Sequence, residues 1–169
     1  MMTLLSTANG LRFAAAIACM LALAACNSSA GASGGPGGYG VGAALPGSPR
    51  DFAVNVGDRV LFQQDQSDIT PEGQKTLNKQ AQWLSAYPRY TVTIEGHADE
   101  RGTRDYNFAL GERRATAVRD YLMAQGTSGQ RIRTISYGKE RPVATCDDES
   151  CWSQNRRAVT VLDGAGSNS

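Results

Sequence analysis

One short stretch concentrates the reactive side chains of this sequence: GHADERGT, residues 96–103, holds a histidine, two carboxylates and an arginine. Such a set could serve a metal ion, an acid–base dyad, a phosphate group or only solvent. Zinc sites use three or four ligands, and His97 is the only histidine in the chain. Side chains at a strand end alternate between faces, so His97, Asp99 and Glu100 need not converge. The stretch therefore does not predict a metal site.

Catalytic chemistry finds no better support in the sequence. A G-x-S-x-G nucleophile elbow is absent. A glycosidase needs a carboxylic acid with a raised pKa, whereas the nearby arginines would lower the pKa of Asp99 and Glu100. The spacing of Gly96, Gly102 and Gly111 is not that of a phosphate-binding loop and indicates turns and close packing instead. We expect neither an enzyme nor a bound cofactor.

A second feature with chemical meaning lies fifteen residues after Asp99, in a segment with helical periodicity. At about 100° per residue, taking Val118 as zero, Arg114 falls at about −40°, near the middle of the apolar stripe. Asn107 falls at about −20° on the same side, and Arg113 at about −140° on the opposite side. The apolar members of the stripe are Tyr106, Leu110, Val118 and Leu122. The pattern predicts that Arg114 faces the core and that Arg113 faces solvent.

A core-facing arginine keeps its charge and needs a partner. Asp99 lies in the loop that enters this helix, which makes it the natural carboxylate to face Arg114. One interpretation is a structural ion pair that fixes the loop to the helix. The other is a pocket for the zwitterionic end of an amino acid, in which Asp99 holds an ammonium and Arg114 binds a carboxylate bidentately. Backbone amides at the loop–helix junction would assist with the anion.

Periodicity and capping residues place the elements around these side chains. Thr70 and Pro71 start a helix that Pro88 ends, and Gly126 ends a second helix. Trp83 and Trp152 are expected to pack in the core or against a disulfide. We predict strands at 58–62, 91–95, 131–137 and 157–162 and helices at 71–87 and 104–125. This β-α-β-α-β-β order predicts an α/β fold, an α+β sandwich with helices packed on a four-stranded mixed sheet.

The N-terminus is expected to direct the chain to the cell envelope. Residues 1–25 combine Arg12 with a short apolar run, as secretory signal peptides do. The run ends in Leu-Ala-Ala followed by Cys26, which resembles a bacterial lipobox and predicts lipidation of that cysteine. Asn27 rather than aspartate follows it, which favours the outer membrane and its periplasmic face. We predict a Gly/Ser/Pro-rich tether over 26–52, a folded domain over 53–163 and a tail over 164–169.

Charge and cysteine content narrow the possible partners. Loss of Arg12 with the signal leaves 16 basic and 16 acidic residues, so no global field favours nucleic acid. Cys19 leaves with the signal and Cys26 is lipidated, which leaves Cys146 and Cys151 to form a disulfide in an oxidising periplasm. The segment CDDESC could also be half a metal site, but the sequence offers no second cluster to complete it.

The stretch GHADERGTRDYNFALGERRATAVRDYL, with NRRAV near the end, resembles OmpA-like peptidoglycan-binding domains over roughly residues 55–163. With the lipobox and tether, it resembles the peptidoglycan-associated lipoproteins within that family. The resemblance implies that the matching Asp99 and Arg114 bind the D-centre of meso-diaminopimelate in the peptidoglycan stem peptide. It implies further contacts from Asp65, Gln64, Thr103, Asn107, Leu110 and an arginine of the NRR motif, Arg156 or, preferably, Arg157.

One departure from the family pattern concerns the residues after the first strand. Relatives often have Phe-x-Phe-Asp there, whereas this chain has Phe62, Gln63, Gln64 and Asp65. The second aromatic residue is missing, and the contact made at position 64 is accordingly open.

The resemblance also implies a biological role. It describes an outer-membrane lipoprotein that binds the cell wall non-covalently, as part of the Tol–Pal system that constricts the envelope at cell division. The alternative is a periplasmic protein–protein module whose main ligand is TolB. The sequence does not decide which partner dominates.

Overall fold

The computed structural model describes residues 44–163. Its centre is a four-stranded mixed sheet with the strand order β1-β4-β2-β3. β1 (Arg59–Leu61) and β2 (Thr91–His97) both pair antiparallel with β4 (Arg157–Asp163), and β2 pairs parallel with β3 (Ile132–Gly138). The predicted α/β fold is confirmed. The predicted signal peptide, the lipidation site Cys26, most of the tether and the tail lie outside the described residues.

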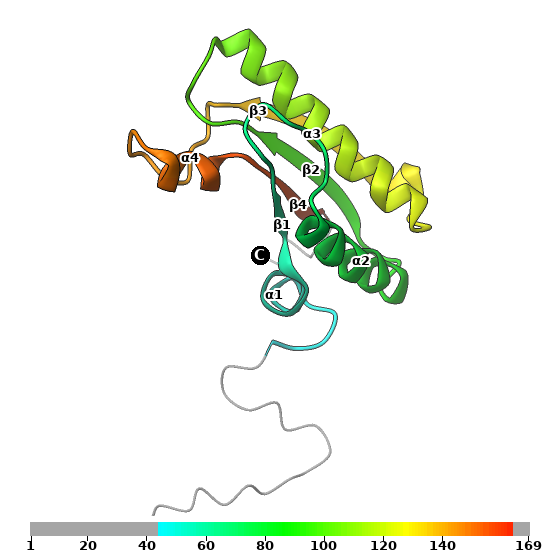
Figure 1. The fold of residues 1–169 in the computed structure, drawn as a ribbon. Helices are drawn as coiled ribbons and strands as arrows, with labels where there is room; N and C mark the ends of the chain where they lie inside the picture. The colour runs from blue at the N-terminus through cyan, green and yellow to red at the C-terminus, as the bar shows by residue number, and fades with distance from the viewer. Residues whose placement is uncertain (1–43, 164–169) are drawn as a thin grey trace, which may run out of the picture. The chain divides into compact units, whose positions relative to one another are not determined.

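Two long helices cover one face of the sheet (Figure 1). α2 (Pro71–Ala86) is capped at its N-terminus by Thr70, whose hydroxyl accepts a hydrogen bond from the amide of Gly73 at 3.1 Å. α3 (Arg104–Ala124) is capped at its N-terminus by Thr103, whose hydroxyl accepts a hydrogen bond from the amide of Tyr106 at 3.2 Å. The core contains Leu77, Ala81 and Leu84 of α2 and Ala115, Val118 and Leu122 of α3. The four strands contribute Val60, Val92, Ile94, Ile132 and Ala158.

The contact between α3 and β2 is close because two glycines meet there. A Cβ atom added to Gly96 would lie 1.8 Å from the carbonyl oxygen of Gly111, and one added to Gly111 would lie 2.4 Å from the Ser136 hydroxyl. These positions accept only glycine without displacement of the helix. The close approach brings the first turns of α3 against the end of β2, where the GHADERGT loop begins.

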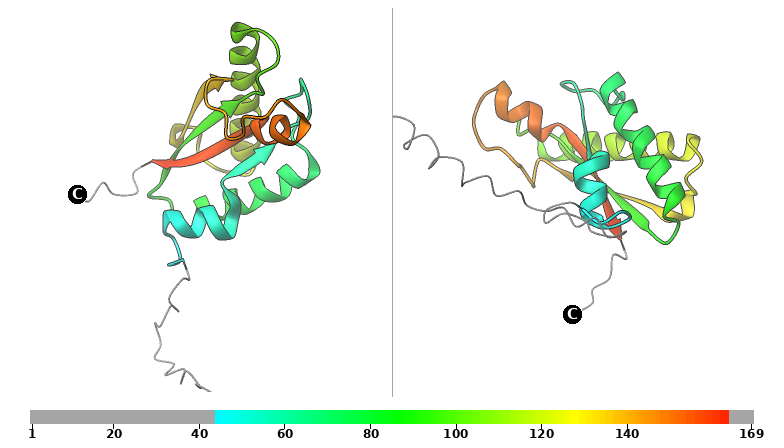
Figure 2. Two further views of the ribbon diagram at one scale, coloured as in Figure 1. Left: turned by 90° about the vertical axis from the view of Figure 1, so that its left-hand side faces the viewer. Right: turned by 90° about the horizontal axis from the view of Figure 1, so that it is seen from below.

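The folded region starts earlier than the composition predicts. α1 (Pro49–Asp51) and the following π-helical turns, η1 (Phe52–Gly57), lie beside α2 in both views of Figure 2. Phe52 is 2% exposed, and its ring centroid lies 5.0 Å from that of Trp83. The Asp51 carboxylate accepts a hydrogen bond from the Trp83 indole at 2.8 Å. The boundary predicted at residue 53 therefore falls inside a packed segment, because one aromatic side chain docks a stretch of otherwise tether-like composition.

The segment between β3 and β4 contains a helix that periodicity did not predict. α4 (Glu149–Asn155) starts at Asp148, whose carboxylate accepts from the amide of Ser150 at 2.8 Å. A disulfide joins Cys146 to Cys151, with their Cα atoms 5.5 Å apart. A 3₁₀ turn, η2 (Gly129–Arg131), precedes β3. Among the described residues, no helix is both long enough and apolar enough to cross a bilayer.

Candidate functional site

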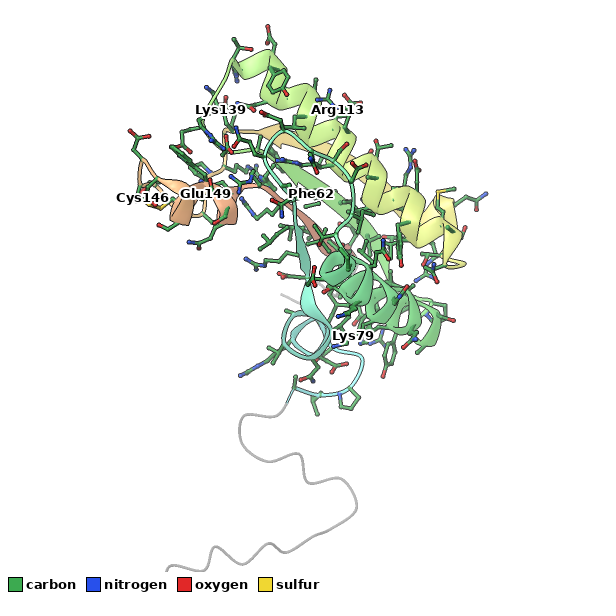
Figure 3. All side chains as sticks on the ribbon, in the orientation of Figure 1. Phe62, Lys79, Arg113, Lys139, Cys146 and Glu149 are labelled. Atoms are coloured by element: carbon green, nitrogen blue, oxygen red, sulfur yellow. A yellow bond between two sulfur atoms is a disulfide. The ribbon has the colours of Figure 1, made fainter. Side chains whose placement is uncertain are left out.

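The predicted faces of the two neighbouring arginines of α3 are confirmed. Arg113 is exposed, whereas Arg114 is 0% exposed and carries one of the largest fully buried side chains of the described region. In Figure 3, Phe62 lies between α3, which carries Arg113, and the α4 region, marked by Cys146 and Glu149. The Arg114 guanidinium carbon lies 5.2 Å from the centroid of the Phe62 ring.

Backbone carbonyl groups satisfy much of the buried Arg114 guanidinium. Its Nε donates to the carbonyl of Gln66 at 2.9 Å, and its Nη2 donates to that of Gln63 at 3.1 Å. Its Nη1 donates to the carbonyl of His97 at 2.8 Å. Burial lowers the pKa of Arg114 to about 10, although the charge of Asp99 raises it. Arg114 therefore stays charged at neutral pH and fixes the loop after β1 to the end of β2.

Asp99 and Arg114 form no direct ion pair, which was one of the two interpretations of the sequence. Asp99 is 7% exposed, and its carboxylate instead binds Arg101, whose Nη2 lies 2.6 Å from Oδ2. Arg156 also reaches Oδ2, with its Nη1 at 3.4 Å. Burial raises the pKa of Asp99, but the hydrogen bonds and charge of Arg101, together with Arg156, outweigh this effect. The net pKa of Asp99 is therefore below its ordinary value. The structural ion pair is absent because backbone carbonyls accept the hydrogen bonds of the Arg114 guanidinium.

The two arginines of the NRR motif lie in different surroundings. Arg156 donates from Nε to the carbonyl of Phe62 at 3.1 Å and also pairs with the Glu149 carboxylate. Arg157 is the first residue of β4, and it donates to the carbonyls of Asn155 at 3.3 Å and Arg141 at 3.1 Å. Arg156 is therefore the neighbour of the Asp99 carboxylate. The preference for Arg157 as a binding residue stays a prediction, and the contacts of Arg157 hold the segment before β4.

The other predicted residues surround this cluster at different depths. Asn107 is 1% exposed and donates to the Arg101 carbonyl at 2.6 Å, which fixes the loop. Leu110 is 3% exposed on the same helix. Asp65 is exposed, has a left-handed backbone with φ 53°, and its carboxylate lies 3.5 Å from the Tyr106 hydroxyl. Gln64 is exposed beside it, and Thr103 caps α3.

Arg101, Glu149 and Trp152 join the cluster, although no role was predicted for Arg101 or Glu149. The Arg101 guanidinium carbon lies 4.1 Å from the centroid of the Trp152 ring. The Trp152 indole donates to the Glu100 carboxylate. Arg101 belongs to the GHADERGT stretch, so its position was visible in the sequence. Glu149 and Trp152 come from a short helix with no periodic signal.

The His97 ring is not among the groups that contact the Asp99 carboxylate. It is 2% exposed and stacks on Tyr137, with 5.6 Å between ring centroids. Burial, with the charges of Arg157 and Arg141, lowers the pKa of His97 to about 4. The ring is therefore neutral at pH 7, and the Glu95 carboxylate 3.7 Å away does not form an ion pair with it. Within residues 44–163, no three His, Cys, Asp or Glu side chains are placed to hold a metal ion.

Comparison with known proteins identifies the family of this chain. The OmpA family model matches residues 61–156. A curated relative from Rhizobium meliloti, named peptidoglycan-associated lipoprotein, is 68% identical over 77% of this chain and 74% of its own length. One of the same name from Pseudomonas aeruginosa is 44% identical over 86% of this chain and 93% of its own length.

A solved structure shows the same fold. The crystal structure of the peptidoglycan-associated lipoprotein from Burkholderia pseudomallei superposes with a TM-score of 0.64 and 38% identity. The match covers 68% of this chain and 99% of that protein. The chain belongs to the OmpA family and, within it, to the peptidoglycan-associated lipoproteins.

Proposed function

We propose that this chain is a non-catalytic outer-membrane lipoprotein that binds the peptidoglycan stem peptide non-covalently through meso-diaminopimelate. The names of its relatives associate them with peptidoglycan. The observation that carries the proposal is a carboxylate surrounded by guanidinium groups at the mouth of one loop. Asp99 lies between Arg101 and Arg156, with the charge of Arg114 close behind it.

The chemistry of the ligand fits this charge arrangement. The D-centre of meso-diaminopimelate bears an ammonium and a carboxylate on one carbon atom. Asp99 would bind the ammonium. Arg114 uses three of the five donor hydrogens of a guanidinium on backbone carbonyls, and Arg156 adds a second cation for the ligand carboxylate. We assign Arg156 to this role in place of Arg157.

The remaining residues would shape the walls around that centre. Asn107 holds the loop backbone, and the buried Leu110 would pack beneath the ligand. Thr103, at the start of α3, would offer its helix-terminal amides to an anion. Gln64 and Asp65 stand at the exposed rim, where Gln64 would replace the aromatic contact of relatives.

The lipid at Cys26 would place this site in the periplasm beneath the outer membrane. The predicted tether would then join this lipid to the folded domain. Anchored in this way, the domain would connect the outer membrane to the wall. In the Tol–Pal system this connection would draw in the envelope at cell division.

Binding to purified sacculi tests the proposal. We expect Asp99→Asn to weaken binding by about tenfold or more, because it removes a charge-assisted contact worth about 1.5–3 kcal/mol. Arg113→Ala, which removes an exposed arginine of the same helix, is the matched control and should bind like the parent chain. Circular dichroism verifies that both variants fold. Equal binding by Asp99→Asn and Arg113→Ala would refute the assignment of the site.

We further propose TolB as a protein partner of the same exposed rim. Two separate surfaces would let TolB and the wall bind together, whereas a shared surface makes them compete. Addition of soluble stem peptide to a TolB complex distinguishes these arrangements. Displacement of TolB supports a shared surface, and an unchanged complex contradicts it. Incubation of the domain with sacculi should release no soluble fragments if the protein is non-catalytic.

A further inference from the structure

In the structure, every hydrogen-bonding contact of the Asp99 carboxylate comes from an arginine. Oδ1 accepts from the backbone amide of Arg101 at 3.2 Å and from its Nε at 3.2 Å. Oδ2 accepts from Arg101 Nη2 at 2.6 Å and from Arg156 Nη1 at 3.4 Å. Because the Asp99 side chain is only 9% exposed, an incoming ammonium cannot simply add to its carboxylate. A third cation on one carboxylate would also be repelled by the two already there.

The two guanidinium groups differ in how firmly they are held. Arg156 is 4% exposed and is fixed by the carbonyl of Phe62 and by the Glu149 carboxylate. The Arg101 side chain is 32% exposed, and its hydrogen bonds go only to Asp99. Its remaining support is the face of the Trp152 ring at 4.1 Å. Arg101 is therefore the partner that can leave without exposing another buried polar group.

We propose that Arg101 occupies the ammonium position of the site and that the ligand's ammonium replaces it on Asp99. This inference rests on the proposed function and adds a residue that determines specificity. The exchange replaces one cation with another, so the charge around Asp99 is unchanged. A ligand that brings only carboxylates cannot release Arg101. The site therefore selects molecules that carry an ammonium and a carboxylate together.

The exchange makes an unusual prediction for a cationic residue beside an anionic ligand. Binding requires Arg101 to leave, so the apparent dissociation constant is raised by the small fraction of molecules in which Asp99 is free. Removing the side chain should therefore tighten binding. Loss of a partly exposed ion pair with a stacked ring should lower the apparent dissociation constant about three- to tenfold. A conventional ligand contact would give the opposite change.

The test is calorimetric titration of the tripeptide L-Ala-γ-D-Glu-meso-diaminopimelate into the parent chain and three variants. Arg101→Ala should bind about fivefold tighter than the parent chain. Arg104→Ala is the control, because this substitution removes the same charge three residues further along the chain. Arg104 pairs with Glu140 at 3.1 Å rather than with Asp99. It should bind equally or slightly more weakly. Arg101→Lys keeps the charge but loses the planar contacts, so it should lie between the parent chain and Arg101→Ala.

The outcomes separate this inference from the proposed function. If the parent chain binds the tripeptide and Arg101→Ala binds no tighter than Arg104→Ala, the exchange is wrong and the binding site stands. If neither the parent chain nor Arg101→Ala binds, both are wrong. The Nε–H nuclear magnetic resonance signal of Arg101 provides an independent readout. It should change when the parent chain is saturated with tripeptide, and an unchanged signal in the complex would overturn the exchange.

Discussion

Replacement of Arg114 by alanine should destabilise the fold far more than replacement of its neighbour Arg113. The Arg114 guanidinium donates three hydrogen bonds to carbonyls of Gln63, Gln66 and His97 and is 0% exposed. Arg114→Ala would remove these donors and leave a cavity. An unsatisfied buried acceptor costs about 1–3 kcal/mol. Because water would enter the cavity and satisfy some of the carbonyls, we expect a total loss of about 4 kcal/mol.

Arg113→Ala should change the free energy of unfolding by less than about 0.5 kcal/mol, since that side chain is exposed. Urea denaturation followed by the fluorescence of the buried Trp83 measures both variants. Arg114→Lys keeps the charge but cannot span three carbonyls with one ammonium, so about 2 kcal/mol is expected. If Arg114→Ala and Arg113→Ala unfold at the same urea concentration, the assigned role of Arg114 is refuted. The predicted loss also means that binding by Arg114→Ala must be measured where that variant is shown to be folded.

Three further perturbations test other parts of the structure. The pKa of His97 is about 4 in the folded chain against an ordinary 6.5. As pH falls from 6.5 to 4, the unfolded chain therefore binds a proton that the folded chain does not, and stability should fall by up to about 3 kcal/mol. His97→Gln should remove that decline, and an equally steep profile in this variant would contradict it. Phe52→Ala should cost about 3 kcal/mol, since the ring packs on Trp83. Gly96→Ala should cost at least about 3 kcal/mol, because its Cβ would meet the Gly111 carbonyl. Chemical denaturation checks both, and a loss below about 1 kcal/mol in either would contradict the packing.

Regular elements were predictable from the sequence because their signals are local. The cap at Thr70, the terminator Gly126 and the apolar stripe of α3 placed both long helices within a residue or two. The same stripe placed Arg114 inward and Arg113 outward. α4 was missed because seven residues give too short a periodic signal. The true start of the fold was missed because Phe52 is a single aromatic residue beside a Gly- and Pro-rich segment.

The partners of the site residues were harder to predict because they come from distant segments. Arg114 binds carbonyls of the loop after β1, and no side-chain pattern reports where a carbonyl lies. The Asp99 carboxylate meets Arg156, a contact that depends on where β4 begins. A shift of one residue in that boundary exchanges the surroundings of Arg156 and Arg157. The contacts of Arg114 and Asp99 therefore depend on the path of the backbone, which residue types alone do not predict.

Calorimetric titration of the diaminopimelate tripeptide into the parent chain and into Asp99→Asn tests the central claim most directly. We expect saturable binding with one tripeptide per domain, weakened about tenfold or more by the loss of the Asp99 charge. Binding of equal affinity to both forms, or no binding to the parent chain, would contradict it.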